Sequence, residues 1–423
     1  MTEASAGSAK QSIAAAAGFT DDWRGFLKVI SLASGAPFMG SMLTIVLPIL
    51  PNISKDISGG TDDPLLGRLV VAMPTMGIVL GGIIAGFLLT RFAARHVLLT
   101  AIVLFGIVGG AGIVLDGTAL LASRFLIGSV GVCIAASSTT LIGDFIPADR
   151  RPRVLGLQTA SGSLIGIIMM NLSGMLSDSF GWRASFMLFP AMAVVVILFG
   201  LALIPLRMPA AATASGSAGE KLSQWSLLKP LLPIYLLLMV LHIEAFTTNS
   251  QASFVLAADG VIDAAGRARM MSINQTMIVI AAISYPFTRA LLGPRWIPAL
   301  LFTCMTTGLL ILGTQENLLI VGLGLAILGV SNGTLFPHQS TLILARAHPA
   351  VRGRAVGLLS SNQFFADSIN PFILAPLIAA VGLKNAIATV GLMCGVGLLV
   401  ALIYGVRTNN PPAPATAATG SGH

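Results

Sequence analysis

Three ionisable residues stand inside long apolar stretches of the sequence, which is a costly place for a charge. Glu244 and Asp367 each lie near the middle of such a stretch, and Arg124 lies in a third one, shortly before Gly128 and Gly131. Because burying a charge in an apolar surrounding is costly, groups of this kind are functional candidates by default. A carboxylate that is removed from water binds its proton more tightly, and a nearby cation makes it release that proton. We therefore expect Glu244, Asp367 and Arg124 to take part in proton coupling, or the two acids to hold a cationic substrate.

Two polar stripes contain the acids. In each stripe the residues recur every three or four positions, so they share one face of a helix. The first stripe consists of Glu244, Thr247, Thr248 and Gln251, and the second of Ser360, Gln363, Asp367 and Asn370. A polar face on an apolar helix is expected to line a water-filled cavity. The residues expected to bind substrate are therefore Glu244, Thr248, Gln251, Gln363 and Asn370, joined by His338 and Asn171 from other apolar stretches.

A structural interpretation stands beside each of these assignments. The acids can form hydrogen bonds inside a helix bundle, and Arg124 can fix its helix to a neighbouring carbonyl or acid. His338 follows Pro337 and can satisfy carbonyls that the proline leaves unpaired. Asn171 can join two helices by a hydrogen bond. The residue types alone leave both interpretations open.

The composition indicates which elements must hold these residues. Hydrophobic residues make up 55% of the 423 positions and charged residues only 9%, and the mean hydropathy is +0.90. Soluble domains carry about 25% charged residues, so the composition disfavours a soluble enzyme. The apolar stretches are long enough to cross a bilayer as helices, and they are far longer than the strands of about ten residues in a membrane β-barrel. The sequence therefore predicts an all-α polytopic membrane protein.

Twelve membrane-spanning helices are predicted, six on each side of a polar linker. They cover residues 26–50, 66–90, 96–115, 118–143, 153–178, 184–206, 229–255, 268–290, 296–313, 317–345, 354–380 and 384–406. The linker at 207–228 is rich in Ala, Ser and Gly, which favours a flexible connection. It separates a first six-helix lobe at 26–206 from a second at 229–407, with short tails at 1–25 and 408–423.

The distribution of Lys and Arg predicts the orientation of the chain. With the N-terminus in the cytoplasm, 17 of the 24 basic residues lie on the cytoplasmic side and six on the outer side, while Arg124 lies inside a span. Basic residues favour the cytoplasmic side of a membrane. The pattern therefore predicts that both termini are cytoplasmic, and it supports an even number of spans.

The two lobes resemble one another in sequence. With a shift of 201 residues, the fourth and fifth spans align with the tenth and eleventh without a gap, so that Gly128 aligns with Gly329 and Arg151 with Arg352. An ungapped match across two spans predicts a parallel repeat of six-helix units. Such a repeat places a substrate path between two lobes that rock against each other.

Several segments resemble the major facilitator superfamily. Residues 86–95 (GFLLTRFAAR) are similar to the family's loop signature G-x-x-x-D-R-x-G-R-R, with Thr90 in place of the acid and Ala93 in place of a glycine. Residues 124–131 (RFLIGSVG) match its pattern R-x-x-x-G-x-x-G, and residues 180–186 (FGWRASF) are similar to a junction common in the family. The resemblance covers nearly the whole chain, and it implies the major facilitator fold and transport by alternating access.

The resemblance also implies a motif that gates the pathway on the cytoplasmic side. Its residues here are Gly86, Thr90, Arg91, Arg95, Asp144, Arg151 and Arg352. Because Thr90 stands where the family has an acid, Asp144 or Asp149 is expected to supply the missing charge. The family's antiporters often carry G-P-x-x-G-G in the fifth span, and residues 169–174 here read MMNLSG, which keeps only the last glycine. The general pattern remains similar to bacterial drug and metabolite efflux members that exchange their substrate for protons.

These features predict a secondary active transporter in the bacterial inner membrane that exports a small amphipathic or hydrophobic organic compound in exchange for protons. One alternative is a proton symporter that imports a small organic acid, aromatic acids included, with Arg124 holding the carboxylate. A more distant alternative is a membrane sensor that does not transport. An enzyme is not expected, because the five histidines are scattered and no phosphate-binding loop is present.

The expected partners follow from the same features. The substrate is a small molecule, the proton gradient is the driving force, and membrane lipids surround a monomer whose single chain holds both lobes. Nucleic acid is not an expected partner, because no basic run is dense enough to follow a phosphate backbone. Neither a cofactor nor a metal is expected, since Cys133, Cys304 and Cys394 each lie alone in an apolar stretch.

Overall fold

The computed structural model describes residues 35–57, 64–145, 151–200, 227–348 and 351–407, and within these ranges it is entirely helical. The predicted tails, most of the predicted linker and the first residues of the first predicted span lie outside this description. The predicted cytoplasmic location of the two termini therefore stays a prediction.

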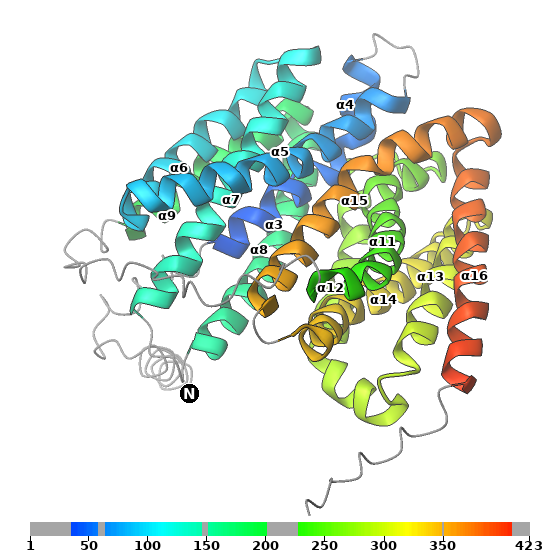
Figure 1. Ribbon diagram of the computed structural model, residues 1–423. Coiled ribbons are helices and arrows are strands. Elements are labelled where there is room, and N and C mark those ends of the chain that lie inside the picture. Colours follow the sequence, from blue (N-terminus) through cyan, green and yellow to red (C-terminus); the bar gives the residue numbers. More distant parts are fainter. Residues whose placement is uncertain (1–34, 58–63, 146–150, 201–226, 349–350, 408–423) are drawn as a thin grey trace, which may run out of the picture.

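The helices form two bundles that follow one another along the chain (Figure 1). The first bundle contains α3 (Gly35–Thr44), η1 (Leu47–Ile49), α4 (Leu50–Ile57), α5 (Pro64–Arg91), α6 (Ala94–Gly110), η2 (Ala111–Ile113), α7 (Gly117–Phe145), α8 (Arg151–Phe180), η3 (Trp182–Met187) and α9 (Leu188–Gly200). The second bundle contains η5 (Lys229–Leu231), α11 (Leu232–Ala258), α12 (Ala264–Leu292), α13 (Ile297–Thr314), α14 (Leu318–Arg346), α15 (Arg352–Val381) and α16 (Leu383–Arg407).

Most observed helices match the predicted spans within a few residues, whereas the helical segment at the first predicted span, 26–50, continues to Ile57. Eleven helical segments of the described chain are long and apolar enough to cross a membrane. The sixth predicted span, 184–206, corresponds to a shorter apolar helix at Trp182–Leu198, and its last residues lie beyond the described range. An all-α membrane protein is thus confirmed, and the count of twelve stays a prediction.

Helix ends carry the residues that the backbone requires there. Asp263 caps the start of α12 by accepting a hydrogen bond from the Gly266 N–H over 2.6 Å, as acidic and amide side chains commonly do. Gly181 and Gly382 follow the ends of α8 and α15 with φ angles of 85° and 83°, which favour glycine. These two glycines lie 201 positions apart (382 minus 181), which is the offset of the predicted repeat.

Equivalent helix pairs pack closely in both bundles. Gly128 in α7 lies against the backbone of α5 at Pro74, and Gly329 in α14 lies against the backbone of α12 at Asn274. A side chain at either position would collide with the neighbouring helix. Membrane helices usually need small residues to pack this closely. The two glycines that the repeat aligns therefore have the same packing role, one in each bundle.

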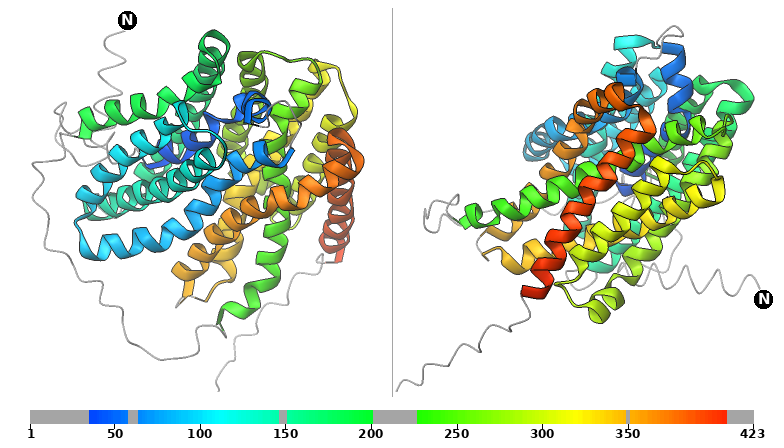
Figure 2. Two further views of the ribbon diagram at one scale, coloured as in Figure 1. Left: turned by 90° about the horizontal axis from the view of Figure 1, so that it is seen from above. Right: turned by 90° about the vertical axis from the view of Figure 1, so that its right-hand side faces the viewer.

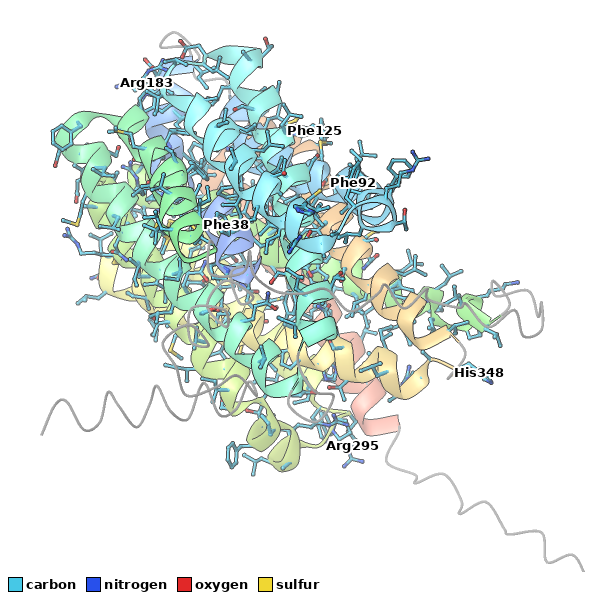
Figure 3. All side chains as sticks on the ribbon, turned by 90° about the vertical axis from the view of Figure 1, so that its left-hand side faces the viewer. Phe38, Phe92, Phe125, Arg183, Arg295 and His348 are labelled. Carbon is cyan, nitrogen blue, oxygen red and sulfur yellow. The ribbon has the colours of Figure 1, made fainter. Side chains whose placement is uncertain are left out.

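The outside of the bundles is apolar. Ile83 is 74% exposed, Phe287 78% and Leu291 86%. In Figure 3, Phe38 lies among the helices of the first bundle while the exposed Phe92 lies at its margin. An apolar surface of this kind requires lipid around it, since large apolar patches are rare on soluble monomers.

The two bundles meet mainly along two helix pairs, α5 with α15 and α8 with α12, with smaller contacts of α12 with η1 and of α11 with η1 and α4. In Figure 1, α15 lies between α5 of the first bundle and α11 of the second. The left view of Figure 2 shows the bundles side by side, with blue to teal helices in one and green to red helices in the other. The side chains along these pairs therefore belong to the interface between the bundles.

Candidate functional site between the two bundles

Arg267 joins the bundles at one end of the molecule. It lies in the first turn of α12 and is 1% exposed. Its Nε donates a hydrogen bond to the Pro48 carbonyl over 2.8 Å, and its Nη2 donates to Asn52 Oδ1 over 2.7 Å, both in the first bundle. Its Nη1 donates to the carbonyls of Val261 and Ile262 in its own bundle. We call this end, where α5 and α12 begin and α8 and α11 end, the joined end.

Asp178, near the end of α8, caps a helix of the opposite bundle. Its two carboxylate oxygens accept hydrogen bonds from the backbone N–H groups of Ala264 and Ala265, each over 2.8 Å. The first N–H groups of a helix have no partner inside the helix, and a negative charge there is favourable. Gly174, one turn earlier, permits the close approach, because a Cβ there would lie 2.8 Å from the Ala264 carbonyl oxygen. The contact therefore depends on both the acid and the glycine.

A chain of hydrogen-bonded side chains crosses between the bundles beside these contacts. Arg68 of α5 is 3% exposed, and its Nε donates to Gln251 Oε1 of α11 over 2.9 Å. Gln251 Nε2 donates to Ser250 Oγ over 3.1 Å, and Ser250 Oγ donates to Asn370 Oδ1 of α15 over 3.3 Å. The Arg68 guanidinium also lies 5.3 Å from the ring centroid of Phe254. The predicted substrate residues Gln251 and Asn370 thus belong to one polar connection between the bundles.

Asp367 lies on α15, the helix of the second bundle that packs against α5. The next residue, Ser368, shares a hydrogen bond of 3.0 Å with Thr75 of α5. Asp367 is 7% exposed, and no described residue forms a hydrogen bond or ion pair with its carboxyl group. An unpaired buried carboxyl is costly, so this group is placed to bind a proton or a ligand next to a contact between the bundles.

Glu244 points to a different place. It is 5% exposed, and its carboxyl group lies beside the thiol of Cys394 on α16, inside the second bundle. Its Oε2 has no partner among the described residues. Of its predicted stripe, Thr247 accepts from Asn370 Nδ2 over 2.8 Å, and Gln251 reaches the first bundle. The stripe therefore faces three different neighbouring helices.

Arg124 is fully buried inside the first bundle. Its Nη2 donates to the Gly109 carbonyl of α6 over 3.0 Å. Its Cζ lies 4.7 Å and 5.1 Å from the ring centroids of Phe186 and Phe189. Within the described chain, its Nη1 has no hydrogen-bond partner. These contacts fix α7 to α6 and α9, which is the structural role that the sequence left open for this residue.

The remaining predicted substrate residues are distributed among several contacts. Asn171 of α8 donates to Ser272 Oγ of α12 over 2.7 Å, so it joins the bundles. His338 shares a hydrogen bond of 3.3 Å with the Tyr285 hydroxyl inside the second bundle. Gln363 is half-buried on α15. Thr248 lines a small pocket inside the second bundle.

The predicted gating motif lies at the end opposite the joined end. The Thr90 hydroxyl donates to the Phe87 carbonyl of its own helix over 2.7 Å, and the Arg91 guanidinium lies 4.9 Å from the Phe87 ring centroid. A Cβ on Gly86 would meet nothing within 4 Å, and Arg95 lies in the first turn of α6. The side chains of Asp144, Asp149, Arg151 and Arg352 lie outside those that the structure describes.

Three residues of the joined end were not selected from the sequence. Arg68 and Arg267 counted only as outer basic residues near the ends of spans, and Asp178 received no role. The helices begin at Pro64 and Ala264, earlier than the predicted 66 and 268, which places both arginines inside helical turns. A lone Arg in the first turns of an apolar span was the available signal, but it indicates a buried contact only once the covering helix is known.

The arrangement defines a polytopic helical membrane protein. Among the residues described, no group of three or more His, Cys, Asp or Glu could hold a metal ion. Two helical bundles instead meet along polar contacts that include a buried, unpaired acid. Residues 32–371, which are most of the chain, match the family model of the Major Facilitator Superfamily. The chain therefore belongs to the Major Facilitator Superfamily.

Curated relatives confirm the resemblance to drug-efflux members of this family. Multidrug resistance protein MdtG of Enterobacter lignolyticus (strain SCF1) is 28% identical over 367 residues, which are 82% of this chain and 83% of that protein. MFS-type transporter ungB of Aspergillus violaceofuscus (strain CBS 115571) is 26% identical over 348 residues. That match covers 75% of this chain but 62% of the relative, so the chain spans less than two-thirds of that protein's length.

A solved structure shares the fold. The crystal structure of nucleoside transporter NupG superimposes with a TM-score of 0.70 at 14% sequence identity, covering 89% of this chain and 98% of that one. At this identity the similarity shows only that the helices are arranged in the same way.

Proposed function

We propose that this chain exports small amphipathic or hydrophobic organic compounds in exchange for protons, by alternating access, in the inner membrane of a bacterium. The observation that carries the proposal is Asp367, a buried carboxyl without a partner in the described chain, on the helix that packs against the opposite bundle. A carboxyl group in such a place binds a proton in one arrangement of the bundles and releases it when its surroundings change. Relatives named as multidrug resistance proteins support export.

The joined end supports the alternating-access part of the proposal. The predicted topology makes it the outer end, so the arrangement corresponds to a state that is closed outside. The contacts of Arg267, Asp178 and Arg68 must break when the bundles rock to the opposite state. Proton binding at Asp367, beside the α5–α15 contact, is suitably placed to bias that movement.

The contacts of Arg124 support a substrate that binds without this residue. Its guanidinium lies against two phenylalanine rings and donates to a backbone carbonyl within the first bundle. A substrate carboxylate would have to displace these contacts to reach it. The organic-acid import alternative therefore receives no support from its proposed anchor.

Transport by the purified full-length chain in proteoliposomes tests the proposal. The probes are tetraphenylphosphonium as a lipophilic cation, chloramphenicol as a neutral amphipathic compound and benzoate as an organic acid. A pH-sensitive dye trapped in the lumen reports proton movement. We expect the cation or the neutral compound to move against its own gradient while protons move the opposite way.

Substitution of Asp367 separates coupling from translocation. Asp367→Asn should abolish accumulation against a gradient and keep the exchange of labelled for unlabelled probe, because the amide cannot carry a proton. Asp116→Asn is the matched control, since Asp116 is an exposed acid paired with Arg183 inside the first bundle. Inward movement of benzoate together with protons would replace export with symport. Unaltered accumulation by Asp367→Asn would remove Asp367 from the coupling role.

A further inference from the structure

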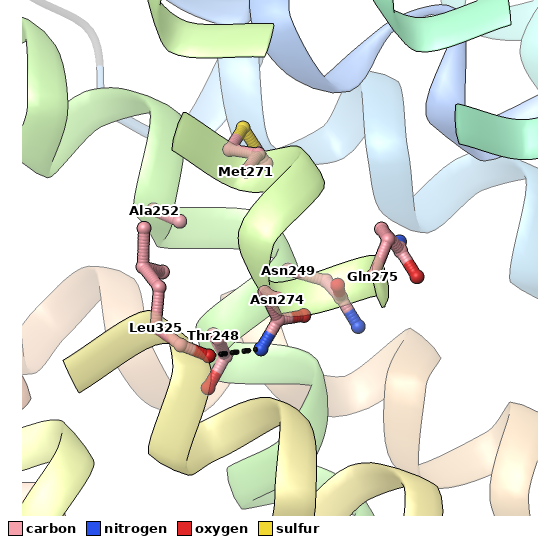
Figure 4. Close-up of a pocket in the computed structure, with 7 residues that line it drawn as sticks. All are labelled: Thr248, Asn249, Ala252, Met271, Asn274, Gln275 and Leu325. Carbon is pink, nitrogen blue, oxygen red and sulfur yellow. Dashed lines mark hydrogen bonds between the residues drawn. The ribbon is translucent and has the colours of Figure 1, made fainter. Parts of the chain in front are cut away.

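A small pocket lies inside the second bundle between α11, α12 and α14 (Figure 4). We call it the amide pocket; it is lined by Thr248, Asn249, Ala252, Met271, Asn274, Gln275 and Leu325. Four of these side chains carry neutral hydrogen-bonding groups, three are apolar, and none is charged. An amide offers both a donor and an acceptor, and a hydroxyl does the same. The pocket has room for one group about the size of a water molecule, so its lining suits a single neutral hydrogen-bonding group.

The hydroxyl group of Thr248 lacks the partner that threonine hydroxyls in a helix usually have. Its neighbour Thr247 donates to the Ile243 carbonyl of the same helix over 2.9 Å. Thr248 is 2% exposed, and its Oγ1 has no hydrogen-bond partner among the described residues. A buried hydroxyl left unpaired is unfavourable. A ligand in the amide pocket would supply the missing partner.

One side-chain amide of the pocket has a hydrogen-bond partner in the described chain, and two do not. Asn274 Nδ2 donates to the Leu325 carbonyl over 2.9 Å, which is the dashed line in Figure 4 and fixes this amide between α12 and α14. No described residue hydrogen-bonds with the side-chain amides of Asn249 or Gln275. Asn274 thus gives the pocket a rigid wall, while Thr248, Asn249 and Gln275 offer groups for a ligand.

A second unpaired polar side chain lies on the same face of α14. Both amide atoms of Asn332 are buried, and neither has a partner in the described part of the chain. Asn332 is seven residues, nearly two helical turns, from both Leu325 and Gln339, so the three share a face. Leu325 lines the amide pocket, and Gln339 lies 2.6 Å from His242 of α11. Asn332 therefore continues the neutral polar lining of the pocket along α14 toward α11.

We propose that the amide pocket and Asn332 hold the uncharged hydrogen-bonding head group, a carboxamide in the first instance, of the compound that the transporter carries. The inference rests on the proposed transport function and names its substrate class. A carboxylate or an ammonium would enter a lining without an opposite charge, at a large desolvation cost. Glu244, one turn before Thr248 on α11, lies toward Cys394 of α16 and does not line the pocket.

Binding of four compounds that share one ring tests the proposal. The purified full-length chain in lipid nanodiscs is dialysed to equilibrium against benzamide, benzoate, benzylamine or acetophenone, with empty nanodiscs as the measure of partition into lipid. We expect benzamide to bind most tightly. Acetophenone keeps only the acceptor and should bind more weakly. Benzoate and benzylamine carry charges and should bind more weakly than both.

Two substitutions connect the binding to the pocket. Thr248→Val and Asn332→Leu should each weaken benzamide binding about 3- to 10-fold, the usual effect of one neutral hydrogen bond. Thr248→Val should leave the melting temperature unchanged or raised, because its hydroxyl has no partner to lose. Thr303→Val on α13 is the matched control, since that hydroxyl donates to the Ala299 carbonyl of its own helix over 2.8 Å, away from the pocket. It should leave benzamide binding unchanged.

The outcomes separate this inference from the proposed transport. Absence of benzamide binding, equal binding of benzylamine, or unchanged affinity in both variants would overturn it and leave the pocket to ordered water. Benzamide binding without any proton movement in proteoliposomes would keep the pocket and reject the coupling. Proton-linked export of tetraphenylphosphonium without benzamide binding would keep the transport and reject the pocket.

Discussion

Arg68 and Gln251 lie 183 positions apart in the chain, and their side chains meet between the two bundles through a hydrogen bond of 2.9 Å. Arg68 is 3% exposed and Gln251 1% exposed, so the bond is shielded from solvent and lipid. A hydrogen bond to a charged group contributes more than a neutral one. This pair therefore holds the joined end closed, together with the contacts of Arg267 and Asp178.

Removal of the Arg68 guanidinium should open the joined end. Arg68→Met keeps the length of the side chain and removes the donor, which costs about 1.5–3 kcal/mol for a bond to a charged group. The fraction of molecules open at this end should rise roughly tenfold or more. The measurement is the rate at which an impermeant maleimide labels Ser253→Cys, a fully buried position at the joined end. Arg269→Met serves as control because Arg269 is exposed and its one ion pair among the described residues is with Asp263 of its own bundle. Equal labelling rates in both variants would contradict the expectation.

Asp178→Ala should loosen the contact between α8 and α12. The substitution removes the cap from the first N–H groups of α12, an effect of about 1 kcal/mol, and removes a charge that the helix dipole favours. Spin labels at Phe180→Cys and Ile262→Cys, both highly exposed at this end, report the separation by pulsed EPR once Cys304 is replaced by serine. We expect a longer and broader distance distribution. Asp56→Ala, which changes an acid within the first bundle at the same end, should leave the distribution as in the parent protein.

Arg124→Lys should lower stability rather than uncouple transport. A lysine cannot place a planar cation against the rings of Phe186 and Phe189, and such a contact contributes about 2 kcal/mol when it is buried. The melting temperature in detergent should fall. Arg295→Lys is the matched control, because Arg295 is exposed and lies 5.8 Å from the Trp296 ring centroid. An unchanged melting temperature combined with lost proton movement would return Arg124 to a coupling role.

Gly77→Ala should destabilise the packing of α5 against α7. A Cβ at Gly77 would overlap the backbone of α7 at Phe125, so one of the two helices must shift. Overpacking of this kind costs about 1–3 kcal/mol. Gly82→Ala on the same helix meets nothing within 4 Å, and alanine should stabilise the helix there by about 0.5–1 kcal/mol. Thermal unfolding of the two variants checks the sign of each change, and a stable Gly77→Ala protein would show that α5 and α7 can separate without cost.

The spans, the repeat and the family followed from the sequence. The predicted span 66–90 became α5 at Pro64–Arg91, because an apolar stretch of that length can satisfy its backbone in a bilayer only as a helix. Gly128 and Gly329, aligned by a shift of 201, pack α7 against α5 and α14 against α12. These features depend on local composition and periodicity, which the chain carries in consecutive residues.

The partners of polar side chains did not follow from the sequence. Helical spacing places Glu244 and Gln251 on one face, yet Glu244 meets Cys394 of α16 while Gln251 meets Arg68 of α5. The reason is that α11 crosses different helices along its length, so residues on one face meet different neighbours. Asp178 likewise carries no local signal, because its partners are backbone groups of α12 that lie 86 and 87 positions away.

The sequence by itself thus determined where the helices lie, that they repeat, and which residues are too polar for their surroundings. The tertiary structure decided which of those residues face the opposite bundle, which face their own, and which are left without a partner. Periodicity fixes the direction of a side chain relative to its own helix axis, whereas its partner is fixed by helix packing between segments that are distant in the chain. Only that packing leaves Asp367, Thr248 and Asn332 without a hydrogen-bond partner among the described residues.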